Sequence, residues 1–137
     1  MNMKWDLRFL DVAILVSSWS RDPSTKCGAL IVNTDRHPIS MGYNGLPKEM
    51  PDDPAILNNR VEKYKHIIHA ERNAILNADI SVSDCTLYVT HPCCEACAQF
   101  IADSGIRRVV YPSDPEFEAR WNAEPARQIL LNAGIVV

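Results

Sequence analysis

Apolar and charged side chains alternate at helical spacing near the beginning of the chain. Leu7, Leu10, Ala13 and Ile14 recur within residues 5–19, with charged residues between them, which predicts an amphipathic helix ending near residues 21–23. Two short apolar runs follow, at residues 26–33 and 38–43, and a polar turn separates them. Runs of this length around a turn predict a β-hairpin.

The pattern changes twice in the middle of the chain. Residues 44–59 are rich in proline, asparagine and aspartate and have no sustained period, which predicts a long loop. Apolar residues at helical spacing then predict a largely buried helix over residues 66–78. A β-branched run at residues 86–90 predicts a strand after that helix.

The last third of the chain repeats this alternation. Residues 94–104 predict a helix capped by Gly105, and residues 107–111 predict a strand. The prolines and acidic residues near position 115 predict a loop, followed by a helix over residues 125–132 and a short strand over residues 135–137. Strands that alternate with helices after a hairpin indicate an α/β domain, residues 1–137, with a helix-covered, mostly parallel sheet.

Composition narrows the class of protein. The 137 residues are 47% hydrophobic and 23% charged, as in a globular domain, and the net charge of −3 argues against a long nucleic-acid partner. No apolar run approaches membrane length, and charged residues interrupt the N-terminal segment where a signal peptide would need its apolar core. We therefore expect a cytoplasmic protein with no membrane partner.

Three of the five cysteines crowd into residues 93–97, which favours metal ligands over disulfides. His69 and the pair Cys94 and Cys97 lie on two predicted helices that flank one strand, so the three side chains can converge. One imidazole and two thiolates suit Zn²⁺, and three protein ligands leave the fourth position for water. Zinc lowers the pKa of such a water towards neutrality.

Glu71 distinguishes a catalytic site from a structural one. It lies two residues after His69, off the face that carries the ligand, where its carboxylate can exchange protons with the bound water. Two alternatives stay open on the residues alone. Cys93 is a rival ligand, since Cys93 and Cys97 also have helical spacing, and His91 could complete a closed structural site with four ligands.

These residues form the pattern H-x-E followed by C-x-x-C, which resembles the zinc nucleoside deaminases. The resemblance extends to segments 21–29, 42–45, 69–75, 88–90 and 104–106, nearly the whole chain, and is specific to the deoxycytidylate (dCMP) deaminase family. In these deaminases a proline directly precedes the first cysteine of the pair, as P-C-x-x-C. Here Pro92 precedes Cys93 rather than Cys94, which is a departure from that pattern. The family's distance from the strand at residues 88–90 favours Cys94 as the ligand.

The resemblance implies a three-layer α/β/α fold with a five-stranded mixed sheet and one zinc ion per chain. It also implies hydrolytic deamination at C4 of dCMP, which yields ammonia and dUMP for thymidylate synthesis, with Glu71 moving the protons. Related enzymes are homo-oligomers, commonly hexamers, regulated by dCTP and dTTP. Asn44 is expected to bind a sugar hydroxyl. The phosphate is expected to meet Arg21, Ser24 and Lys26 or the basic residues within 60–65.

Two other functions are compatible with the same metal residues. A tRNA adenosine deaminase carries a similar H-A-E segment and cysteine pair, but the net charge and segment 42–45 favour a nucleotide substrate. A zinc-stabilised binding module without turnover would need no Glu71. We therefore expect an enzyme.

Overall fold

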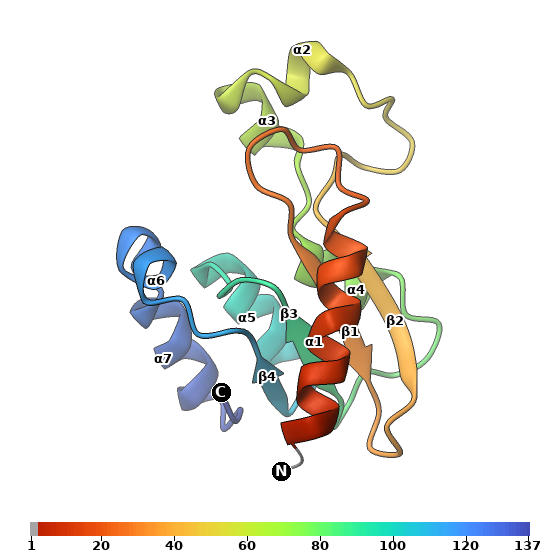
Figure 1. Ribbon diagram of the computed structural model, residues 1–137, viewed down its shortest axis with the longest axis vertical. Helices are drawn as coiled ribbons and strands as arrows, with labels where there is room; N and C mark the ends of the chain where they lie inside the picture. The colour runs from red at the N-terminus through yellow and green to blue at the C-terminus, as the bar shows by residue number, and fades with distance from the viewer. Residues whose placement is uncertain (1–2) are drawn as a thin grey trace.

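A four-stranded sheet with the strand order β2-β1-β3-β4 forms the centre of the molecule (Figure 1). The structure is a computed structural model that describes residues 3–137. β1 pairs antiparallel with β2 and with β3, whereas β3 and β4 are parallel. The strands are β1 (Gly28–Val32), β2 (Pro38–Tyr43), β3 (Thr86–Val89) and β4 (Arg108–Val110).

The sheet is mixed, as expected, but the expectation that it is mostly parallel is wrong. The opening hairpin places β1 between β2 and β3, so two of the three strand pairs are antiparallel. The fifth strand expected at residues 135–137 is also wrong. Within the described residues this segment makes an isolated parallel bridge between Val136 and Arg108, beside a strand that is itself only three residues long.

Helices cover both faces of the sheet and give the expected three layers (Figure 1). Side chains of β1 alternate between two cores, because successive residues of a strand point to opposite faces. Leu30 and Val32 pack with Phe9 on one side, and Ala29 and Ile31 pack on the other. The covering helices are α1 (Met3–Ser17) on the first side, and α4 (Ala70–Leu76), α5 (Glu95–Ser104) and α7 (Glu124–Asn132) on the second.

Three further helices occupy segments that the sequence analysis did not predict as helical. They are α2 (Pro54–Leu57), α3 (Arg60–His66) and α6 (Pro115–Trp121). Each begins at a side-chain cap, and α2 and α6 have their proline in the first turn, where a missing N–H costs no hydrogen bond. The loops predicted at residues 44–59 and near 115 are wrong at these points. In residues 3–137, no helix has the length and apolar character needed to cross a membrane.

Candidate active site

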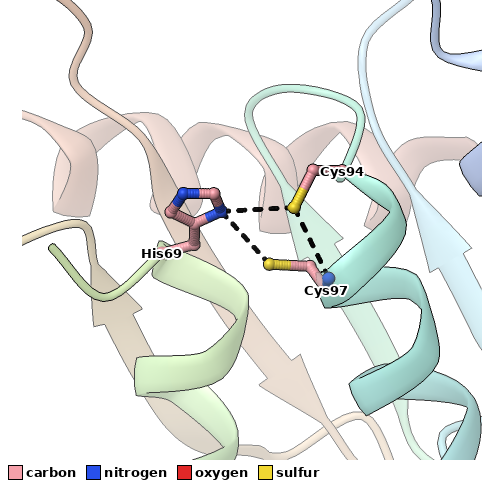
Figure 2. A group of neighbouring side chains, drawn as sticks. All are labelled: His69, Cys94 and Cys97. Atoms are coloured by element: carbon pink, nitrogen blue, oxygen red, sulfur yellow. Dashed lines mark hydrogen bonds between the residues drawn. The ribbon is translucent and has the colours of Figure 1, made fainter. Parts of the chain in front are cut away.

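The first turns of α4 and α5 meet and bring one histidine and two cysteines together (Figure 2). His69 is the N-cap residue of α4, Cys94 is the N-cap residue of α5, and Cys97 lies in the first turn of α5. His69 Nδ1 lies 3.2 Å from Cys97 Sγ and 3.5 Å from Cys94 Sγ. All three donor atoms lie within 4.8 Å of one another.

This geometry fits a zinc ion. Zn–S and Zn–N bonds of normal length in a tetrahedron separate the ligand atoms by roughly 3.6 to 3.8 Å, close to the observed spacing. A hydrogen bond with Cys97 and the neighbouring His69 lower the pKa of Cys94 to about 3. The same hydrogen bond with Cys94, together with burial, raises the pKa of Cys97. One sulfur is therefore a ready thiolate ligand, and metal binding displaces the proton from the other.

The two alternative ligands lie outside this cluster. Cys93 is only 7% exposed, and burial raises the pKa of its thiol to about 12. His91 Nδ1 instead faces Thr90 Oγ1 at 2.9 Å and Cys27 Sγ at 3.4 Å. The structure thus groups Cys94, and not Cys93 or His91, with His69 and Cys97.

Glu71 lies in the first turn of α4 and is only 5% exposed. Its side chain lines the same cavity as His69 and Cys94. Burial raises the pKa of its carboxyl, because the charged form loses its hydration. A buried carboxyl of raised pKa beside a metal site is suited to accept and release a proton during a reaction.

Edge strand β2 and the segment after it hold α4 in place. Gly45 and Ile68 exchange backbone hydrogen bonds of 3.1 and 2.8 Å. Because Ile68 directly precedes His69, this pairing fixes the position of the backbone where α4 begins. Asn73 Nδ2 then donates to Tyr43 O at 2.8 Å. At Gly42 a side chain would collide with backbone atoms of α4, so the absence of a Cβ permits the close approach.

The metal residues open into a cavity of about 1000 Å³. α3 contributes Arg60, Lys63 and Tyr64 to its wall, and α6 contributes Phe117, Arg120 and Trp121. The ring of Phe117 lies 4.7 Å from His91 and 5.9 Å from Trp121, centroid to centroid. The cavity thus combines a metal site and a buried acid with aromatic and cationic walls, which suits a planar, anionic ligand.

The four residues predicted to bind substrate do not all reach this cavity. Ser24 and Asn44 line it, whereas Arg21 and Lys26 are exposed and are not among its lining residues. The Asn44 amide is engaged with the protein: its oxygen accepts from Cys27 N at 2.8 Å, and its nitrogen donates to Thr25 O at 2.9 Å. In the structure Asn44 therefore holds the loop of residues 22–27.

Of the basic residues within 60–65 expected near the phosphate, Arg60 and Lys63 line the cavity. Sequence reasoning did not predict two other features of the cavity wall. The contact of Lys63 with Asp22 joins residues 41 positions apart, and no local pattern indicates it. The aromatic pair Phe117 and Trp121 does have helical i,i+4 spacing, a signal that the neighbouring prolines obscured.

Comparison with known proteins agrees with this site. Residues 3–113 match the family model for the cytidine and deoxycytidylate deaminase zinc-binding region. The chain is 40% identical to "Uncharacterized deaminase in luxG 3'region" of Aliivibrio fischeri, over 100% of this chain and 94% of that protein. It is 35% identical to the deoxycytidylate deaminase of Mus musculus, over 97% and 78% of the two chains.

Solved structures agree on the fold. The dCMP deaminase from the cyanophage S-TIM5 in apo form superposes with a TM-score of 0.80 at 24% identity, covering 100% of this chain and 98% of that one. With a family model that matches residues 3–113 and relatives that align over 97% or more of this chain, the chain belongs to the zinc-dependent cytidine and deoxycytidylate deaminase family of hydrolases.

Proposed function

We propose that this protein deaminates dCMP hydrolytically, converting dCMP and water into dUMP and ammonia. The observation that carries the proposal is the buried Glu71 beside the His69, Cys94 and Cys97 cluster, in a chain that aligns with deoxycytidylate deaminases over nearly its whole length. A binding module without turnover does not need that acid. Membership of a deaminase family argues against such a module as well.

His69, Cys94 and Cys97 are the proposed zinc ligands. When bound, zinc supplies Lewis-acid activation of water at the open fourth position. Glu71 takes a proton from the attacking water and delivers it to ring N3 of cytosine. It then takes the remaining proton from the hydroxyl group added at C4 and passes it to the amine, so that the C–N bond breaks, ammonia leaves and the carbonyl of uracil forms. The raised pKa of Glu71 suits both transfers.

Nucleotide recognition falls to the cavity wall. Ser24 lines the cavity where sugar and phosphate oxygens can approach, and we keep it as a proposed contact. Asn44 lines the cavity too; both N–H groups of its amide are used within the protein, but its oxygen accepts one hydrogen bond and keeps a second lone pair for a sugar hydroxyl, so we keep it as well. Arg60 and Arg120 also line the cavity and are candidates to bind the phosphate. Among the described residues, the guanidinium group of Arg60 contacts only the ring face of Tyr64, and that of Arg120 contacts only the ring face of Phe117. They are better placed than Arg21 and Lys26, because those two residues do not line the cavity. A guanidinium group at the cavity can also bind a phosphate through two parallel N–H groups.

A substrate panel tests the assignment. Zinc-loaded protein should turn over dCMP with a kcat/KM at least tenfold to a hundredfold above that of deoxycytidine, since each charge-assisted contact contributes on the order of 1.5 to 3 kcal/mol. Arg60→Gln should lower kcat/KM for dCMP and spare deoxycytidine. Arg107→Gln, a change in an exposed pair with Asp84, is the control and should alter neither. Equal efficiency on both substrates would refute nucleotide recognition and leave the deaminase chemistry standing.

We also propose that copies of the chain associate into a homo-oligomer, with a hexamer as the expected size. Leu7, Ile14 and Leu15 of α1 are each more than half exposed, and a row of exposed apolar side chains favours association. Light scattering across a concentration series measures the mass directly.

Regulation by dCTP and dTTP is a further proposal, tested by adding each to the dCMP assay. All five cysteines are free thiols, which supports the proposed cytoplasmic location.

A further inference from the structure

His91 lines the active-site cavity but has no part in the mechanism proposed above. It lies in the short segment between β3 and α5, outside the cluster of metal residues. Its ring is partly buried and packs against the ring of Phe117 on α6, with 4.7 Å between the two centroids. A polar ring that is held in the wall of a substrate cavity and binds no metal is well placed to contact the substrate.

Two neighbouring groups occupy the Nδ1 side of the His91 ring. Thr90 Oγ1 lies 2.9 Å from Nδ1, and Cys27 Sγ lies 3.4 Å from it. The oxygen of Thr90 already accepts the backbone N–H of Gly28 at 3.1 Å, so its own hydrogen is free to point at Nδ1. Burial raises the pKa of Cys27 to about 12, so its thiol also keeps a proton. Two donors at one nitrogen indicate that Nδ1 is the acceptor of the ring.

The other ring nitrogen of His91, Nε2, then carries the proton. A neutral imidazole has one N–H group, and burial lowers the pKa of His91, which favours the neutral ring. Among residues 3–137 the hydrogen bonds of His91 are made at Nδ1, and Nε2 is not one of the buried side-chain atoms that lack a partner. The Nε2–H group is therefore an unused donor at the surface of the cavity that His91 lines.

His91 lies on the side of the cavity where the phosphate is expected. In the proposed reaction the base must reach the metal residues and Glu71, so the sugar and phosphate extend towards the walls that α3 and α6 contribute. Arg120, a proposed phosphate ligand, places its guanidinium group 5.8 Å from the centroid of the Phe117 ring, and His91 packs against the same ring. The acid at the start of α6, Asp114, accepts the backbone N–H of Phe117 at 3.1 Å, which caps that helix.

We propose that His91 is a specificity-determining residue, whose Nε2–H donates a hydrogen bond to the 5′-phosphate of the substrate. The proposal rests on the nucleotide deamination proposed above. Contacts at Nδ1 and against Phe117 fix the ring before the substrate arrives, so little side-chain freedom is lost on binding. A hydrogen bond to a charged phosphate is stronger than one between neutral groups, and its loss should weaken binding about 10- to 100-fold. His91 thus helps the site to prefer nucleotides over nucleosides.

Binding of dCMP and deoxycytidine tests the proposal without turnover. In zinc-loaded Glu71→Gln protein, calorimetric titration should show that adding His91→Leu weakens dCMP binding about 10- to 100-fold and leaves deoxycytidine binding unchanged. His91→Gln can place an amide N–H near the position of Nε2 and should keep part of the preference for dCMP. His91→Asn reaches only the position of Nδ1 and should lose that preference as the leucine variant does. His37→Leu is the matched control, because His37 is exposed and does not line the cavity.

Steady-state kinetics with Glu71 intact should give the same division, which a merely structural role would not. His91→Leu should raise KM for dCMP, keep kcat, and leave kcat/KM for deoxycytidine unchanged. Equal losses on the two substrates would place His91 at the base or the sugar and overturn the phosphate contact, and so would parental binding of dCMP. Nitrogen NMR that finds the proton of the neutral His91 ring on Nδ1 would overturn it as well.

Two further measurements keep these outcomes distinct. Zinc content should be parental in every His91 variant, because His91 lies outside the metal cluster. If His91→Leu does not fold, the comparison of His91→Gln with His91→Asn decides the question. Parent protein that binds dCMP more tightly than deoxycytidine but does not deaminate it would refute the proposed function, and the titrations would still decide the role of His91.

Discussion

Lys63 on α3 and Asp22, in the loop between α1 and β1, form an ion pair at 3.1 Å with both side chains only 5% exposed. The same Asp22 carboxylate accepts the backbone N–H of Ser24 at 2.8 Å and an N–H of the Asn44 amide at 3.3 Å. One buried acid therefore joins α3, the loop that carries Ser24, and the segment after β2. These three segments form one side of the cavity.

Lys63→Met should destabilise the protein strongly, because it leaves a buried carboxylate without its cation. Breaking such a pair costs about 3 to 5 kcal/mol in the free energy of unfolding, which urea denaturation measures. Lys65→Met is the matched control on the same helix, since its pair with Glu62 is exposed and contributes about 0.5 kcal/mol or less. Similar losses in the two variants would contradict the role given to Asp22.

The two glycines of segment 42–45 should respond in opposite ways to substitution by alanine. A Cβ on Gly42 would collide with backbone atoms of Ala70 and Ala74, which cannot move without shifting α4. We expect Gly42→Ala to cost at least about 2 kcal/mol of stability and to weaken zinc binding, since α4 positions His69. Around Gly45 the nearest atom is the edge of the Tyr43 ring at 3.9 Å, so Gly45→Ala should be tolerated. Equal tolerance at both positions would show that β2 and α4 are not packed as described.

Glu71→Gln should retain zinc and the fold but lower turnover of dCMP by at least about a thousandfold. Glutamine has nearly the same shape and can form hydrogen bonds, but it cannot transfer a proton. Steady-state kinetics combined with metal analysis of the same preparation separates the two effects. Near-normal turnover in zinc-loaded Glu71→Gln would exclude Glu71 as the proton carrier.

Cys94→Ala and Cys93→Ala distinguish the two neighbouring cysteines. Cys94 lies in the cluster with His69, whereas Cys93 lies outside it, so only the first variant should lose zinc. Metal content per chain after dialysis against a weak chelator provides the measurement. Zinc retained in Cys94→Ala and lost in Cys93→Ala would transfer the ligand role to Cys93.

The pair Asp6 and Arg108 should make stability depend on acid pH. Hydrogen bonds from Arg108, at 2.6 and 2.9 Å, lower the pKa of Asp6 below its ordinary value, and Tyr88 donates to the same carboxylate at 2.7 Å. A lowered pKa stabilises the fold above the unfolded value near 4, and this contribution is lost as pH falls through the folded pKa. In urea unfolding from pH 7 to pH 3, Asp6→Asn should be less stable at pH 7 and lose less stability on acidification. Parallel pH profiles for the parent and the variant would rule out this linkage.

The sequence by itself determined the features that depend on neighbours within a few positions. Helical spacing predicted α1 and α5, Gly105 ends α5 with a φ of 91°, and alternating apolar runs predicted the hairpin of β1 and β2. The sequence also indicated His69, Glu71 and the cysteine pair as candidates for the site, because side chains two or three positions apart on short segments have nearly fixed relative directions. Resemblance to a family then indicated a substrate.

Tertiary structure decided what depends on segments meeting across the fold. Whether Cys93 or Cys94 joins His69 depends on how α4 and α5 approach each other, and both cysteines have suitable spacing in the sequence. The strand order, with β1 between β2 and β3, made the sheet mixed. Prolines that predicted loops instead occupy the first turns of α2 and α6. The contact of Lys63 with Asp22 arises from packing between distant segments, which local residue patterns do not specify.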